Sequence, residues 1–247
     1  MNMRLDKYLA DYTEMTRSQA KKAIREGRIR VNGQRAKKGD DKVSFSDSVL
    51  WDEKEVSGQR YQYIMLNKPA GVVSATQDDK ETTVVEYIRD RRPVGSLPQS
   101  REGKIFLAKD LFPMGRLDKD TEGLLVLTND GELAHRLLSP KNHVEKKYFV
   151  RLDKDLESTD VERIWEGLDI GEKHRTKPAR LEILSPRECY LTITEGKFHQ
   201  VKRMFAKLGK TVLYLKRVEM GNLRMEESLP VGEWRFLTEK EIEELRR

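Results

Sequence analysis

Short apolar runs and amphipathic stretches follow one another along the chain without strict alternation. Four apolar segments have the length and the β-branched or aromatic content of strands: YQYIML, KYFVRL, YLTIT and LYLKRV. Helical periodicity marks stretches near 83–90, 131–138, 159–166 and 198–208. Strands and helices interspersed in this way predict an α+β fold, with a mixed, mostly antiparallel sheet flanked by helices.

The N-terminal segment has the pattern of a small folded unit of its own. Thr16 followed three residues later by Gln19 is a capping box, and Gly27 is placed to end the helix that starts there. The strand-like IRV segment that follows ends at Asn32-Gly33, a hairpin signal. We expect a small α/β domain over 1–58 and a larger domain over 59–247, with the polar stretch 52–60 as the linker.

The excess positive charge is confined to this N-terminal segment. The chain has 247 residues and a formal net charge of +6. Residues 1–42 contain 12 Lys or Arg and six Asp or Glu, whereas the other 205 residues contain 36 of each sign. A basic module joined to a neutral domain indicates a polyanion partner, although the same cations could simply form the solvated face of a small domain. The candidate contacts are Lys21, Lys22, Arg25, Arg28 and Arg30.

Several classes of protein are disfavoured by what the sequence lacks. The longest apolar runs are too short to span a bilayer, and the N-terminal stretch lacks the apolar region of a secretory signal. A single cysteine, Cys189, fits a reducing cytoplasm, and the four scattered histidines do not have metal-ligand spacing. Phosphate-loop, dinucleotide-binding, serine-hydrolase and zinc-protease motifs are missing. We therefore expect no membrane segment and no metal.

A dense cluster of charge precedes one buried strand. The stretch GRLDKDTEGLLVLTNDG at 115–131 places five charged residues directly before an apolar run. A carboxylate on such a loop is anchored by a rigid strand, which suits a catalytic group. Asp118 and Asp120 are both candidates, and each could instead cap a turn or pair with a neighbouring cation. The pattern does not choose between them.

This stretch resembles the signature of pseudouridine synthases of the RsuA type, which modify ribosomal RNA. LNKPAG at 66–71, EKKYFV at 145–150 and EGKFHQVKRMF at 195–205 resemble further motifs of that family in the same order. MRLDKYLA and TRSQAKKAIREGRIRVNG near the start resemble its S4 RNA-binding domain. The resemblance extends from about residue 3 to 244. Between LNKP and GRLD the chain is longer than the family pattern, and the additional residues fall in 89–113.

The resemblance implies roles for individual residues. It matches Asp118 to the catalytic aspartate, Tyr148 to the active-site tyrosine and Lys202 to the basic partner of the aspartate. It also implies substrate-binding roles for four residues: Arg116, Val201, Lys68 and Arg203. Residues 201, 204, 205 and 208 form a helical core stripe, so Lys202 and Arg203 flank buried surface and need an anionic partner or a phosphate. His199 we interpret as a helix residue near the RNA surface and not as a catalyst.

The implied activity is the isomerisation of a specific uridine in ribosomal RNA, in the small-subunit 16S RNA rather than the large-subunit RNA. The segments SPKNHVEKKY and RTKPARLEI favour the small subunit. The reaction needs no cofactor, and the expected partner is ribosomal RNA or an assembly intermediate bound by a cytoplasmic monomer. The alternatives are the same chemistry on large-subunit RNA, a non-catalytic ribosome-assembly protein, and a glycosidase-like enzyme that uses Asp118 with Asp120.

Overall fold

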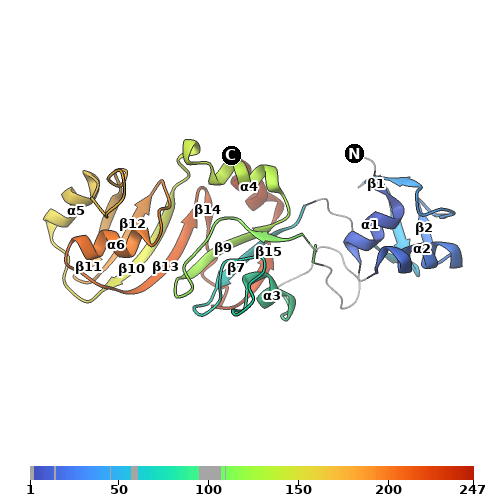
Figure 1. Cartoon of the computed structure of the whole chain (residues 1–247), viewed down its shortest axis with the longest axis horizontal. Helices are drawn as coiled ribbons and strands as arrows, with labels where there is room; N and C mark the ends of the chain where they lie inside the picture. Colours follow the sequence, from blue (N-terminus) through green and yellow to red (C-terminus); the bar gives the residue numbers. More distant parts are fainter. Residues whose placement is uncertain (1–2, 14, 45, 57–60, 95–106, 109) are drawn as a thin grey trace. The chain divides into compact units, whose positions relative to one another are not determined.

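The computed structural model describes residues 3–13, 15–44, 46–56, 61–94, 107–108 and 110–247 (Figure 1). The chain forms two compact units, one of Met1–Gln62 with Gly95–Leu111, the other of Tyr63–Val94 with Phe112–Arg247. The division in the chain lies between residues 62 and 63, a few positions after the predicted boundary. Much of the segment 89–113, which holds the additional residues, lies outside the described residues.

The N-terminal unit combines two helices with two small sheets. Its helices are α1 (Leu5–Tyr12) and α2 (Arg17–Glu26). Its strands are β1 (Met3–Arg4), β2 (Ile29–Val31), β3 (Gln34–Arg35), β4 (Lys42–Val43), β5 (Val49–Trp51) and β6 (Lys54–Glu55). The strand order is β3-β2-β5-β6 in one sheet and β1-β4 in the other. The capping box at Thr16 and Gln19 and the left-handed Gly27 at the end of α2 confirm the local predictions.

The interior of this unit explains why the basic residues lie on its surface. Ala20, Ala23 and Ile24 on one face of α2 are buried against Leu5 and Leu9 of α1. The lysines and arginines of α2 therefore occupy the faces that remain exposed.

The predicted linker at 52–60 was wrong over its first part. Lys54 and Glu55 form strand β6, which pairs with β5, and Val56 is buried in the N-terminal core. A polar sequence can form an edge strand when one buried apolar residue fixes it to the domain, and Val56 does so here. Residues 57–60 lie outside the described part.

The second unit is built on one large mixed sheet. Its main strands are β7 (Tyr63–Lys68), β9 (Glu122–Thr128), β10 (Lys146–Leu152), β11 (Arg180–Ser185), β12 (Glu188–Ile193), β13 (Val212–Met220) and β15 (Trp234–Phe236). They run in the order β11-β12-β10-β13-β9-β7-β15, with β8 (Phe112–Pro113) beside β9 and β14 (Leu223–Arg224) beside β13. Among the strand pairs of the described residues only β9 with β13 is parallel. The prediction of a mixed, mostly antiparallel sheet is confirmed.

Four of the helices of this unit lie close to their predicted positions, and the last in chain order was not predicted. The helices are α3 (Val84–Arg89), α4 (Gly131–Leu138), α5 (Ser158–Trp165), α6 (Gln200–Lys207) and α7 (Glu239–Arg246), with a short 3-10 turn at Pro140–Asn142. Helix α5 packs near β11 and helix α6 near β13 (Figure 1). The core stripe of α6 is buried as expected, since Val201, Met204, Phe205 and Leu208 all face the interior.

Gly123 allows the parallel pair β9–β13 to approach closely. Its φ is +100°, in the region that favours glycine, and a Cβ atom there would clash with the carbonyl oxygen of Arg217 on β13. Residues 123–128 of β9 are all buried, as the apolar run predicts. Strand β9 is thus held tightly at the point where the charged loop enters it.

Candidate active site

The loop that carries Asp118 is anchored through its backbone on both sides of that residue. The hydroxyl of Ser74 donates to the carbonyl oxygen of Leu117 at 2.9 Å and accepts from the Leu117 amide at 3.0 Å. The Gly71 amide donates to the carbonyl oxygen of Lys119 at 2.8 Å, and the Thr121 amide to that of Asp118 at 3.1 Å. These hydrogen bonds fix the backbone position from which the Asp118 side chain extends.

The side chain of Lys68 also holds this loop, through hydrogen bonds to its backbone carbonyl groups. Its side chain is fully buried, and its ammonium group donates to the carbonyl oxygens of Pro69 at 2.9 Å, Lys119 at 3.2 Å and Thr121 at 3.0 Å. Burial lowers the pKa of Lys68 to about 8, against the opposing effect of nearby carboxylates. An ammonium group has three N–H donors, so three carbonyls occupy it completely. This burial argues against the substrate-binding role implied by the sequence and favours a role in positioning the loop.

The two oxygens of the Asp118 carboxylate face different basic groups. Oδ2 lies 3.3 Å from Nζ of Lys202, and Oδ1 lies 3.7 Å from Nε2 of His199. The side chain of Asp118 is 26% exposed, so the carboxylate remains reachable from solvent. Tertiary folding therefore brings the expected aspartate–lysine pair together across more than 80 positions of sequence.

Asp120 shares the same lysine but is in a more open position. Lys202 donates to Oδ1 of Asp120 at 2.5 Å, and the Asp120 side chain is 71% exposed. This hydrogen bond lowers the pKa of Asp120. Burial alone would lower the pKa of Lys202, but the hydrogen bonds and charges of Asp120 and Asp118 outweigh burial and raise it. Lys202 therefore remains a cation beside both carboxylates.

Tyr148 lies in cross-strand register with Gly123, the second residue of β9. Cross-strand partners place Lys68, Gly123, Arg217 and Tyr148 side by side on β7, β9, β13 and β10. Adjacent strands are about 4.8 Å apart, so Tyr148 lies about 10 Å from the backbone of Gly123. In-register partners point to the same face, so Tyr148 and the buried Arg217 share the face on which Gly123 has no side chain.

Arg217 is a component that the sequence did not single out. Its Nε donates to the carbonyl oxygen of Leu124 at 2.7 Å, and its Nη2 is buried with no hydrogen-bond partner among the described residues. In LYLKRV nothing distinguishes it from the adjacent Lys216, which is only partly buried. Only the pairing of β13 with β9 and β10 shows that Arg217 lies beside Gly123 and Tyr148.

The remaining predicted site residues take different positions. Val201 is buried in α6 beside Lys202. Arg203 binds Glu172 at 2.7 Å and donates to the carbonyl oxygens of Ile170 and Phe198. The anionic partners expected for Lys202 and Arg203 are therefore present, and Arg203 has few donors left for a substrate. Arg116 is exposed, and its side chain has no hydrogen bond or ion pair with any described residue, so it is free to bind a phosphate.

His199 lies at the start of α6 instead of inside the helix. It is the N-cap residue, with a left-handed φ of 47°. Its ring stacks on the ring of Phe198, with centroids 3.8 Å apart. The sequence placed it near the RNA surface, and the structure adds its proximity to Asp118, which no local pattern could indicate.

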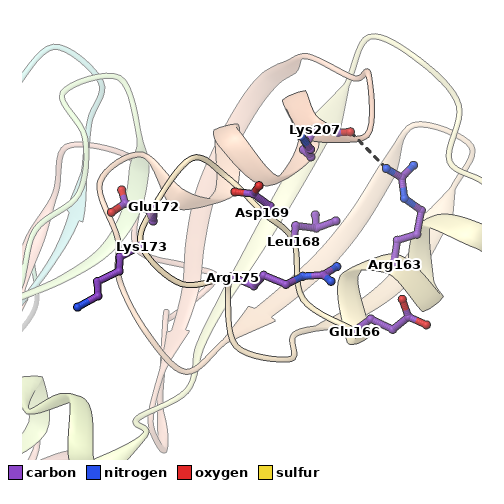
Figure 2. A pocket seen from close by; sticks show the side chains of 8 residues that line it. All are labelled: Arg163, Glu166, Leu168, Asp169, Glu172, Lys173, Arg175 and Lys207. Carbon is purple, nitrogen blue, oxygen red and sulfur yellow. Dashed lines mark hydrogen bonds between the residues drawn. The ribbon is translucent and has the colours of Figure 1, made fainter.

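A surface hollow of about 500 Å³ lies elsewhere, between α5, the 168–175 loop and the end of α6 (Figure 2). It is lined by both basic and acidic side chains: Arg163, Lys173, Arg175 and Lys207 with Glu166, Asp169 and Glu172. None of the predicted site residues lines it. The described residues contain no group of His, Cys, Asp and Glu that could hold a metal, and no helix among them could span a membrane.

Comparison with known proteins gives a family match over the part of the chain that contains Asp118. RNA pseudouridylate synthases match residues 62–207, which include Lys68, Asp118, Tyr148 and Lys202. The chain belongs to the RNA pseudouridylate synthase family. The N-terminal residues 3–49 match the S4 domain. Both parts of the motif resemblance are confirmed, and with them the predicted enzyme class, an RNA-modifying isomerase.

Similarity to individual proteins covers nearly the whole chain. Ribosomal small subunit pseudouridine synthase A of Haemophilus influenzae is 42% identical over 245 residues, 98% of this chain and 99% of that protein. An uncharacterized RNA pseudouridine synthase of Aquifex aeolicus is 42% identical over 249 residues, 99% of this chain and 97% of that protein. A crystal structure of a pseudouridylate synthase, 42% identical, superposes with a TM-score of 0.65 and covers 98% of this chain and 99% of its own.

In the S4 domain the five predicted RNA contacts are not equivalent. Arg28 is hydrogen-bonded to Asp52, and Arg30 to Glu53. Residues 43–56 add four carboxylates and one lysine, so residues 3–56 carry a net charge of +3 and not +6. Lys21 and Lys22 are exposed and lie 3.8 Å from Asp6 and Glu26 respectively. Only Arg25 of the five has a side chain with no ion pair or hydrogen bond to a described residue.

Proposed function

We propose that this pseudouridine synthase isomerises a specific uridine of small-subunit ribosomal RNA, with Asp118 acting on a nucleotide flipped out of its stack. The observation that supports this role is the placement of Asp118. Its carboxylate sits on a loop anchored by Ser74, Gly71 and Lys68, with Lys202 at 3.3 Å. The loop gives the carboxylate little positional freedom, and the lysine stabilises its charge.

The reaction suits this set of residues. The bond between N1 of uracil and C1′ of the ribose breaks, the base turns, and a bond forms between C5 and C1′. N1 gains a proton and C5 loses one, so atoms and charge balance with no oxidant and no transferred group. In the proposed mechanism, an ionised Asp118 serves as nucleophile or base, held by the cation of Lys202. Tyr148 supplies a ring that can stack on the uracil and a hydroxyl near the sugar.

The target uridine has to leave its stack before Asp118 can reach it. Flipping a nucleotide costs a few kcal/mol, which contacts to the RNA backbone offset. The S4 domain supplies such contacts through Arg25 and the exposed Lys21 and Lys22, since phosphate contacts give affinity without reading sequence. Arg116, exposed two residues before Asp118, is placed to hold a phosphate of the target nucleotide itself.

The small-subunit RNA is favoured by similarity to relatives that are named for it. Relatives in Haemophilus influenzae and Pasteurella multocida, each 42% identical over nearly their full length, are named ribosomal small subunit pseudouridine synthase A. We propose the same class of substrate, as free RNA or in an assembly particle, for a monomer acting in the cytoplasm. Modification of large-subunit RNA is the alternative, and mapping pseudouridine in both RNAs from cells with and without the gene distinguishes them.

Two carboxylate variants test the assignment of the catalytic group. Asp118→Asn keeps size and hydrogen bonding but removes the charge, so turnover is expected to vanish while folding and RNA affinity persist. Asp120→Asn is the matched control on the same loop and is expected to retain substantial activity. Tritium release from RNA labelled at C5 of uridine measures turnover. Near-normal turnover of the Asp118 variant, or an equal loss in both variants, contradicts the assignment.

A further inference from the structure

Phe198 is a large aromatic side chain left exposed at the edge of the active site. Phe198 is 69% exposed. One face stacks on His199, with ring centroids 3.8 Å apart and an interplanar angle of 18°. His199 in turn lies 3.7 Å from Oδ1 of Asp118. The exposed ring is therefore separated from the reactive carboxylate by a single imidazole.

This exposure is not explained by the packing of α6. The apolar positions of the helix are filled by Val201, Met204 and Phe205, which are buried, and Phe198 lies outside that stripe. Burying a phenylalanine side chain stabilises a protein by about 1.5–3 kcal/mol relative to leaving it exposed. An aromatic ring that forgoes this stabilisation beside a catalytic carboxylate is suited to contact with a ligand.

The backbone beneath the ring is firmly held. The Lys197 amide donates to Oε1 of Gln200 at 2.9 Å, and the Lys197 ammonium group donates to the carbonyl oxygens of His174 at 2.7 Å and Arg175 at 3.0 Å. Nη1 of Arg203 donates to the carbonyl oxygen of Phe198 itself at 3.0 Å. The ring is presented by a fixed turn, so little conformational entropy is lost when a ligand covers it.

We propose that Phe198 is a stacking platform for a nucleobase adjacent to the flipped uridine. When the uridine leaves its stack, the neighbouring base loses a stacking partner, and the open face of Phe198 replaces it beside Asp118. Every base has a π-face, so the platform is tolerant of sequence and contributes to binding and flipping without choosing the site. The inference rests on the proposed RNA substrate and adds to it a residue that holds the flipped state open.

The test compares three variants of the full-length protein. Phe198→Leu removes the ring but keeps an apolar side chain, and Phe198→Trp restores a stacking surface. Trp165→Leu is the control, because Trp165 is 63% exposed at the end of α5. Arg163 of that helix reaches the carbonyl oxygen of Lys207, at the far end of α6 from Phe198 (Figure 2). An eight-residue helix spans about 12 Å, so the control is well separated from the site.

Affinity for a small-subunit ribosomal RNA transcript and the single-turnover rate of tritium release at saturating protein are measured for each. Phe198→Leu is expected to lower the ratio of rate to Kd by about 5- to 150-fold, as for loss of one base–aromatic stack. Phe198→Trp is expected to recover most of the loss, and Trp165→Leu to behave as wild type. A second measurement uses a short RNA with the fluorescent base 2-aminopurine next to the modified uridine. Flipping of the uridine unstacks this base and raises its fluorescence, and stacking on Phe198 should quench it. The fluorescence should therefore be low with wild-type protein and stay high with Phe198→Leu.

Unchanged activity of Phe198→Leu, or a loss that tryptophan does not repair, overturns the proposal. A failed substrate assignment has a different signature, because wild-type protein then leaves the small-subunit transcript unmodified. The same variants are in that case compared on large-subunit RNA, with the same expected and overturning results.

Discussion

Replacing Lys68 by methionine should separate the positioning of Asp118 from the binding of RNA. Methionine fills a similar volume but cannot donate to the carbonyl oxygens of Pro69, Lys119 and Thr121, which the ammonium group meets at 2.9, 3.2 and 3.0 Å. The Lys119 carbonyl keeps its bond from the Gly71 amide at 2.8 Å. The loop is therefore expected to loosen around Thr121 while its other anchors hold.

The size of the effect follows from two opposing contributions. Hydrogen bonds from a charged donor contribute about 1.5–3 kcal/mol each, so three contribute about 4–9 kcal/mol. Burial lowers the pKa of Lys68 to about 8 from 10.5, which at about 1.4 kcal/mol per pKa unit is a cost of about 3 kcal/mol that methionine does not have. The free energy of unfolding should fall by about 1–6 kcal/mol at pH 7. Displacement of a reacting group by about 1 Å can cost about 100-fold in rate, so we expect kcat to fall about 10- to 100-fold.

The pH dependence of stability supplies a second readout with a defined sign. Because the pKa of Lys68 is lower in the folded protein, the unfolded state binds more protons between about pH 8 and 10.5, and this residue makes stability rise with pH in that window. The stability deficit of Lys68→Met relative to wild type should therefore widen from pH 8 upward. Lys146, whose pKa burial also lowers to about 8, contributes equally to both proteins and cancels in the comparison.

Single-turnover tritium release, filter-binding affinity and urea unfolding across pH 7–10 measure these quantities. The control is Lys119→Met, because Lys119 lies on the same loop but its side chain is half exposed and pairs with Glu81 at 2.7 Å. Its stability should change by no more than about 0.5 kcal/mol. A loss of RNA affinity with normal kcat in Lys68→Met would refute the positioning role and restore a substrate-binding one.

Three further outcomes follow from other parts of the structure. Gly123→Ala should lower the free energy of unfolding by about 2–5 kcal/mol in urea, because overpacking against β13 and a left-handed φ both oppose the added Cβ atom; a stable variant would show that β9 and β13 can separate freely. Arg25→Gln should reduce the slope of log affinity against log salt by about 0.7–0.9, whereas Arg28→Gln should reduce it less because Arg28 is hydrogen-bonded to Asp52; equal slopes would contradict this ranking. Hydrogen bonds from Arg4 lower the pKa of the buried Asp6, so its stabilising contribution is present above about pH 4 and is lost as pH falls through the lowered pKa; Asp6→Asn should unfold more easily at pH 6 in urea and lose less stability on acidification than wild type.

The local signals in the sequence were strong enough to determine most elements. The capping box at Thr16, the Asn32-Gly33 hairpin and the 3.6-residue stripe of α6 all depend on residues within a few positions of one another, and the structure has each of them. The family motifs predicted Lys202 as the basic partner of Asp118, and in the structure the two side chains lie 3.3 Å apart. The predicted linker at 52–60 was wrong over residues 54–56, because the buried Val56 fixes a polar edge strand to the N-terminal core.

Only the tertiary structure showed which side chains that are distant in sequence contact one another. The pattern of the stretch 115–131 does not choose between Asp118 and Asp120, and the choice of Asp118 came from the family resemblance. The fold adds that the two have different surroundings, because Asp118 faces both Lys202 and His199 while Asp120 is mostly exposed. For Lys68, which the resemblance implied as a substrate contact, the fold places three backbone carbonyl oxygens around the ammonium group, and this favours a role as a loop anchor. Local patterns report the propensity and burial of short segments, whereas hydrogen bonds and ion pairs across many strands depend on sheet order and register. That order brings side chains from distant parts of the sequence within hydrogen-bonding distance of one another.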